Sequence, residues 1–129
     1  MSAIIMVVDD NSTNLKLISE LLTYEDHSIL KAVDAEDAQV VLAERLPDLI
    51  LMDIALPGMD GLTLTRRLKA DARTRQIRIV ALTAYAMKGD EQKALDAGCD
   101  GYITKPINTR QFPAQVKAFL ESLPTEASS

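Results

Sequence analysis

Leu49-Ile50-Leu51-Met52-Asp53 is the stretch that decides the fold, and it is followed by Ile54-Ala55-Leu56-Pro57-Gly58-Met59-Asp60-Gly61. Four consecutive apolar residues bounded by turn residues are typical of a strand that is buried on both faces, as in parallel sheets. Such a strand delivers the Asp53 carboxylate at its carboxyl end, where ligands bind in open parallel sheets. From this stretch alone, a helix-capping or turn role explains Asp53 about as well as a functional role.

The rest of the chain repeats this pattern of a strand followed by a helix. Further strands are predicted at Ala3–Val8, His27–Ala32, Ile77–Thr83 and Gly101–Thr104. Helical spacing of apolar residues or capping residues predicts five helices. They run from Asn11 to about Tyr24, from Asp34 until Pro47 ends the helix, from a start after Pro57-Gly58 (marked by Leu62, Leu64 and Leu68) to about Ala72, over Ala84–Ala97, and from Asn108 or Thr109 to Leu123. This alternation predicts an α/β three-layer sandwich of flavodoxin-like class, with a five-stranded parallel sheet in the order 2-1-3-4-5 and five helices.

Composition limits the classes of protein that this chain can be. Its 129 residues suit a single domain, predicted over 1–123, with a short flexible tail at 124–129. The net charge of -5 argues against a general nucleic-acid surface. A local basic cluster is interpreted as the solvated end of a helix; it comprises Arg66, Arg67, Lys69, Arg73, Arg75 and Arg78.

Cysteine content and apolar run lengths bear on location. The single cysteine, Cys99, cannot form a disulfide within the chain, which fits a reducing compartment. No apolar run approaches the ~20 residues of a membrane span, and the first residues lack the charged region of a signal peptide. We therefore expect a cytoplasmic protein with no membrane partner.

Polar side chains follow four of the five predicted strands. Asp9 and Asp10 follow the first, Asp53 ends the third, Thr83 ends the fourth and Lys105 follows the fifth. Because the carboxyl ends of parallel strands meet at one edge of the sheet, these side chains should lie together. Their joint occurrence in this order favours a site over five separate capping or loop residues.

Three carboxylates at close range repel one another and need a cation. The chain has one histidine and one cysteine, so an oxygen-only site for a hard ion such as Mg²⁺ is predicted. Lys105 and the Thr83 hydroxyl suit phosphoryl oxygens, and Asp53 is placed as a carboxylate nucleophile that forms an acyl phosphate.

Four motifs together resemble the response-regulator receiver domains of two-component signalling. They are Val8-Asp9-Asp10-Asn11, Leu51 to Gly61, Leu82-Thr83-Ala84 and Tyr102-Ile103-Thr104-Lys105-Pro106. The stretch Ala84-Tyr85-Ala86-Met87-Lys88-Gly89-Asp90 resembles single-domain regulators of the DivK type, which have no DNA-binding output domain. Similar stretches also occur in the receivers of hybrid kinases.

The resemblance implies a role for each motif residue. Asp53 would accept phosphate from a histidine kinase or phosphotransfer protein. Mg²⁺ would be held by Asp10, Asp53 and the main-chain carbonyl of Ala55, with Asp9 acting through a metal-bound water. Lys105 and Thr83 would bind the phosphoryl group, and Lys105-Pro106 would be a cis peptide.

The resemblance also implies a switch rather than an enzyme with steady turnover. Self-phosphorylation and slow autodephosphorylation would be the only reactions, and apolar Ala55 suggests a long-lived phosphoryl state. Thr83 would move toward the phosphoryl group and Tyr102 would swing inward. A downstream protein would then bind the face made by the fourth helix, fifth strand and fifth helix, and the chain would be a monomer or weak dimer.

Two other classes use related chemistry. A haloacid-dehalogenase-type phosphatase needs Asp-x-Asp after one strand, but the residue two beyond Asp53 is Ala55 and the residue two beyond Asp10 is Ser12. A flavodoxin needs a Ser/Thr-rich phosphate loop after the first strand, and an acidic crevice would repel the flavin phosphate. Turnover of phosphate esters or a bound flavin would favour these alternatives.

Overall fold

The computed structural model describes residues 3–56, 58–83 and 88–121. Within these ranges, five strands alternate with five helices. They are β1 (Ile4–Val8), α1 (Ser12–Tyr24), β2 (Ser28–Ala32), α2 (Ala35–Glu44), β3 (Leu49–Asp53), α3 (Gly61–Ala70), β4 (Arg78–Thr83), α4 (Lys88–Asp96), β5 (Gly101–Thr104) and α5 (Phe112–Glu121). All four strand pairings are parallel, in the order β2-β1-β3-β4-β5. The predicted flavodoxin-like fold is confirmed.

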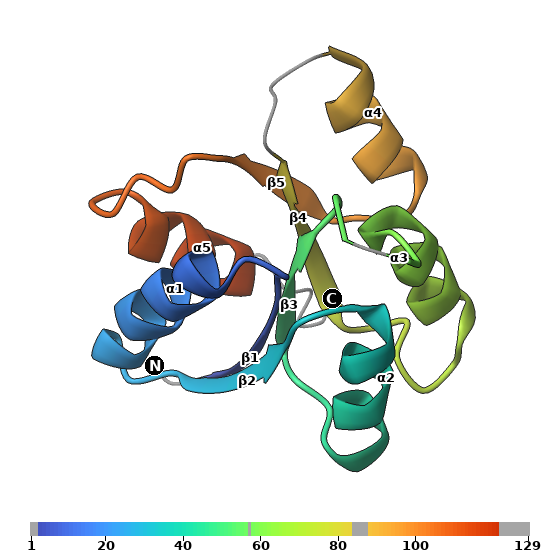
Figure 1. The fold of residues 1–129 in the computed structure, drawn as a ribbon, viewed down its shortest axis with the longest axis horizontal. Coiled ribbons are helices and arrows are strands. Elements are labelled where there is room, and N and C mark those ends of the chain that lie inside the picture. The colour runs from blue at the N-terminus through green and yellow to red at the C-terminus, as the bar shows by residue number, and fades with distance from the viewer. Residues whose placement is uncertain (1–2, 57, 84–87, 122–129) are drawn as a thin grey trace.

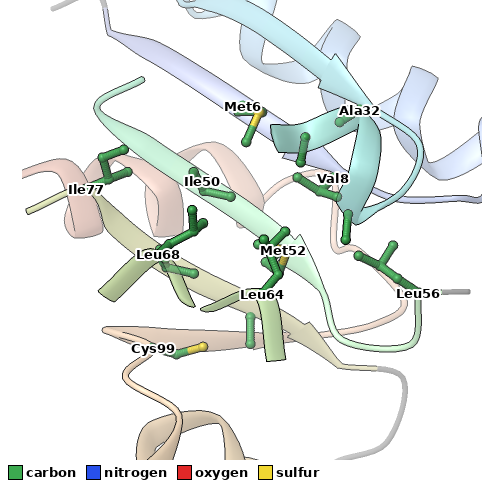
Figure 2. Close-up of a cluster of buried hydrophobic side chains, with 14 of the residues drawn as sticks. Met6, Val8, Ala32, Ile50, Met52, Leu56, Leu64, Leu68, Ile77 and Cys99 are labelled. Carbon is green, nitrogen blue, oxygen red and sulfur yellow. The ribbon is translucent and has the colours of Figure 1, made fainter. Parts of the chain in front are cut away.

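The sheet is the middle of three layers (Figure 1). α1 and α5 pack on one face, where Leu49 and Leu51 of β3 point, whereas α2, α3 and α4 cover the other. The alternate residues of β3, Ile50 and Met52, point to the face that α2, α3 and α4 cover. Figure 2 shows them beside Leu64 and Leu68 of α3. Every residue of β3 is buried. This explains why its sequence is a continuous apolar run rather than an alternating one.

Three helices begin at side chains that accept a main-chain N–H from three residues further on. Asn11 caps α1, Asp34 caps α2 as the sequence indicates, and Asp60 caps α3. These caps satisfy first-turn donors that have no partner within a helix. The α3 cap, Asp60, was not predicted; it lies at the end of the loop that follows Asp53.

One predicted helix end differs from the structure, and several other predicted boundaries fall outside the described residues. α2 ends at Glu44, three residues before Pro47. Arg45 already has an extended backbone, and Pro47 disfavours helical backbone at Leu46, so the helix does not continue. α4 begins at Lys88, whereas the prediction began at Ala84; residues 84–87 lie outside the described part of the chain. So do the predicted tail at 124–129 and Leu123.

The basic cluster around the end of α3 is largely exposed, and three of its residues also contact neighbouring elements. Lys69 donates to the carbonyl oxygen of Ile77 at 2.8 Å and pairs with Asp100 at 3.0 Å. Arg78 also lies 3.7 Å from Asp100, and Arg73 donates to the carbonyl oxygen of Leu42. Arg66, Arg67, Arg73 and Arg75 are exposed, as the interpretation of a solvated helix end requires, whereas Lys69 and Arg78 are half-buried beside Asp100.

Among the described helices, none has the length and apolar character needed to cross a membrane.

Candidate phosphoryl-acceptor site

Asp9 and Asp53 lie side by side at the carboxyl edge of the sheet. Asp53 is the last residue of β3 and is 5% exposed, while Asp9 directly follows β1 and is fully buried. The β1–β3 pairing aligns Val8 with Met52, so each aspartate is one residue beyond a paired position. Each carboxylate also accepts a main-chain N–H two residues on, from Asn11 at 2.9 Å and from Ala55 at 3.0 Å. These bonds fix the orientation of both carboxylates.

Lys105 joins the two buried carboxylates. Its Nζ lies 3.2 Å from Oδ2 of Asp9 and 3.2 Å from Oδ2 of Asp53. The main-chain N–H of Lys105 donates to the carbonyl oxygen of Thr83, which places the lysine beside the end of β4. The Lys105–Pro106 peptide is cis, as predicted. The ammonium group therefore bridges the ends of β1 and β3 through their aspartates.

A third carboxylate completes the cluster. One oxygen from each of Asp9, Asp10 and Asp53 lies within 4.8 Å of the other two, and Asp10 is exposed. Oxygen-only donors match Mg²⁺, and an exposed ligand leaves room for the water molecules that this ion retains. The donor set therefore fits the predicted cation.

Burial perturbs the titration of Asp9. Loss of solvation raises the pKa of this carboxyl above its ordinary value, and the nearby Asp53 charge acts in the same direction. The Asn11 N–H and the Lys105 ammonium oppose this rise in pKa. Three carboxylates also surround the single ammonium group of Lys105, so the cluster keeps a net negative charge that favours binding of a further cation.

The remaining predicted site residues are Thr83, Ala55 and Tyr102, and they lie in three different elements of the chain. Thr83 is fully buried at the end of β4, one residue beyond the partner of Asp53 in the β3–β4 register. Ala55 follows Asp53 in the loop that leaves β3. Tyr102 of β5 is instead 36% exposed, and its hydroxyl donates to Oε1 of Glu91 at 3.1 Å. The hydrogen bond to Glu91 raises the pKa of the Tyr102 phenol.

Sequence reasoning missed two residues near these groups. Glu91 is one of three acidic residues in α4, so no sequence pattern distinguishes it. Gly61 opens α3 against the backbone of Asp53, where a built Cβ would lie 2.3 Å from the Asp53 carbonyl oxygen. A glycine immediately after an N-cap aspartate was the available signal, since the first turn of a helix does not otherwise favour glycine.

The fold and this cluster define a class of protein. It is the class of flavodoxin-like α/β domains that carry an acidic cluster and one lysine at the carboxyl edge of a parallel sheet. The chain belongs to the response regulator receiver domain family, whose model matches residues 5–117.

Individual relatives agree with the family assignment. The polar-differentiation response regulator DivK of Brucella ovis is 40% identical over 120 residues, which cover 93% of this chain and 98% of DivK. Among solved structures, a two-component response regulator from Clostridium difficile is 28% identical with a TM-score of 0.86, covering 95% and 98% of the two chains. The receiver domain of the Pseudomonas aeruginosa sensor histidine kinase PA1611 is 30% identical with a TM-score of 0.85, covering 95% and 100%. That structure has a magnesium ion coordinated in its active-site cleft.

Proposed function

We propose that this chain is a phosphorylation-dependent switch of a two-component or phosphorelay system, and that Asp53 accepts the phosphoryl group. The observation that carries the proposal is the Asp53 carboxylate itself, held at the end of the central strand between Lys105 and two further carboxylates. Membership of the receiver family and the similarity to DivK support it. In this proposal, residues 1–123 form the receiver domain and 124–129 a tail, and the chain works in the cytoplasm.

The proposed reaction is a phosphoryl transfer from a phosphohistidine of a kinase or phosphotransfer protein. An Asp53 oxygen attacks phosphorus, the P–N bond breaks, and its electron pair stays on the imidazole, which takes a proton from solvent. The product is an acyl phosphate on Asp53. Asp10, Asp53 and the Ala55 carbonyl would hold Mg²⁺, with Asp9 acting through water. The bound ion would offset charge on the phosphoryl oxygens.

Lys105 has a second task in this proposal. Its ammonium group already contacts Asp53, so it would exchange that ion pair for one with a phosphoryl oxygen. The Thr83 hydroxyl would donate to another oxygen. Both groups therefore bind the product of the transfer as well as its transition state.

Incubation with acetyl phosphate and Mg²⁺ tests the proposed function without knowledge of the natural donor. We expect the intact mass to increase by one phosphoryl group, and EDTA to prevent the increase. No uptake at saturating Mg²⁺ would contradict the proposal. Continuous release of phosphate from simple phosphate esters would instead indicate a phosphatase.

The output is proposed to start at Thr83 and to pass to Tyr102. Phosphorylation adds about -1.5 to -2 charge and three acceptor oxygens, which would draw the Thr83 hydroxyl toward Asp53. Tyr102 would then leave Glu91 and turn inward, changing the face formed by α4, β5 and α5. That face already exposes apolar groups, with Leu95 at 45% and Tyr102 at 36%. We propose that a downstream protein binds there, to a monomer or weak dimer of this chain.

The Tyr102–Glu91 contact gives a direct measurement of this switch. In the unmodified protein, we expect proton NMR to show contacts from the Tyr102 ring to Glu91, because the hydroxyl donates to that side chain. Beryllofluoride with Mg²⁺, which mimics an aspartyl phosphate, should weaken these contacts and produce new ones to Thr83. Unchanged ring contacts in a protein that binds the mimic would contradict an inward movement of Tyr102.

A further inference from the structure

Gly61 lies against the backbone of the proposed phosphoryl acceptor. It is the first residue of α3, and a Cβ built on it would lie 2.3 Å from the Asp53 carbonyl oxygen, 2.9 Å from the Ile54 Cα and 3.0 Å from the Asp53 carbonyl carbon. Real Cβ atoms essentially never approach heavy atoms within 3.0 Å. All three atoms belong to the main chain, so no side-chain rotation relieves the overlap.

The start of α3 cannot move away to make room. The Gly61 N–H donates to the Ile54 carbonyl oxygen at 3.3 Å, which ties the first residue of α3 to the loop that follows β3. One turn further on, Leu64 is fully buried among side chains from the sheet (Figure 2). Displacing the helix would break the bond to Ile54 and open the core around Leu64, since interiors are close-packed.

The Asp53 backbone is the part that has to yield. Its paired strand holds it on one side, where the Ile54 N–H donates to the Leu82 carbonyl oxygen at 3.3 Å. The carboxylate is oriented by the Ala55 N–H and lies 3.2 Å from Lys105. A shift of the Asp53–Ile54 peptide would therefore change the position of the carboxylate relative to Lys105 and the other two aspartates.

We propose that Gly61 is a positioning residue for phosphoryl transfer: its missing side chain lets α3 contact the Asp53 main chain and so fixes the acceptor carboxylate. The inference rests on the proposed function of Asp53. Displacements of about 1 Å in a reacting group reduce rates by about 100-fold. Gly61 acts through Asp53 and touches no reactant itself.

The test compares Gly61→Ala with wild type in acetyl phosphate and Mg²⁺, measuring the labelled fraction and the rate constant by intact mass. A purely structural defect lowers the observed rate constant only in proportion to the folded fraction, which far-UV circular dichroism measures, because only folded molecules react. Misplacement lowers the rate constant of the folded molecules themselves. We expect a 10- to 100-fold lower maximal rate constant, with a similar half-saturating acetyl phosphate concentration.

Gly101→Ala is the matched control, since a Cβ there would lie 2.2 Å from the Phe119 ring and away from Asp53. It should lose stability and keep the wild-type rate constant. Trimethylamine N-oxide, which favours the compact state, keeps a destabilised variant folded during the assay. An unchanged rate constant in Gly61→Ala would overturn the positioning role. Absence of labelling in wild type would instead overturn the function of Asp53.

Discussion

Asp53→Asn is expected to take up no phosphoryl group from acetyl phosphate and Mg²⁺, a loss of at least about 10³-fold in rate. The amide lacks the negative charge that makes a carboxylate a nucleophile, and it cannot form an acyl phosphate. The variant should remain folded, because it removes one of three mutually repelling carboxylates within 4.8 Å of one another. Loss of uptake is then a chemical defect rather than a folding defect.

Asp60→Asn is the matched control for this substitution. Asp60 lies in the same loop, and its side chain caps α3 by accepting the Thr63 N–H at 2.8 Å. Asparagine caps helices about as well as aspartate, so this variant should fold and be labelled like wild type. Equal labelling of Asp53→Asn and wild type, measured by intact mass, would remove Asp53 from its proposed role.

The layer architecture follows from patterns that are visible in the sequence. Continuous apolar runs such as β3 predict buried parallel strands, and parallel strands bring their carboxyl ends to one edge. Hence Asp9, Asp53 and Lys105, which are separated by up to 96 positions in the chain, could be placed together before the structure was known. The caps were predictable where an acidic or amide side chain precedes the periodic pattern, as at Asp34.

The finer features depend on packing that a single sequence does not encode locally. Asp9 and Asp10 are adjacent and chemically equal, yet one is fully buried against Lys105 and the other is exposed. Lys69, in the last turn of α3, looks solvated in sequence, but its partner Asp100 is brought to it only by the tertiary fold. For the same reason, the close approach of Gly61 to Asp53 became evident only when α3 was placed against β3.

Lys105→Met is expected to lower the free energy of unfolding by about 2–3 kcal/mol at pH 7 in EDTA. Removing one partner of a buried ion pair costs about 3–5 kcal/mol, and the 16% exposure of the Lys105 side chain reduces that cost. Methionine keeps most of the volume, so the effect comes from the lost charge beside Asp9 and Asp53. For a chain of this length, the melting temperature should fall by about 10 °C.

The dependence on pH and on Mg²⁺ identifies the cause of that loss. Burial raises the pKa of Asp9 above that of the unfolded chain. Between these two pKa values, the folded protein holds a proton that the unfolded chain releases. The free energy of unfolding therefore falls as the pH rises from the lower pKa to the higher one. Removing the Lys105 charge should steepen this fall, and Mg²⁺ or acidification should reverse it. Lys69→Met, which breaks the 3.0 Å pair with Asp100, should lose stability without either response. Thermal unfolding of both variants at pH 5 and pH 7, with EDTA or Mg²⁺, makes the comparison. A Lys105→Met variant as insensitive to Mg²⁺ as Lys69→Met would show that Lys105 does not compensate the aspartate cluster.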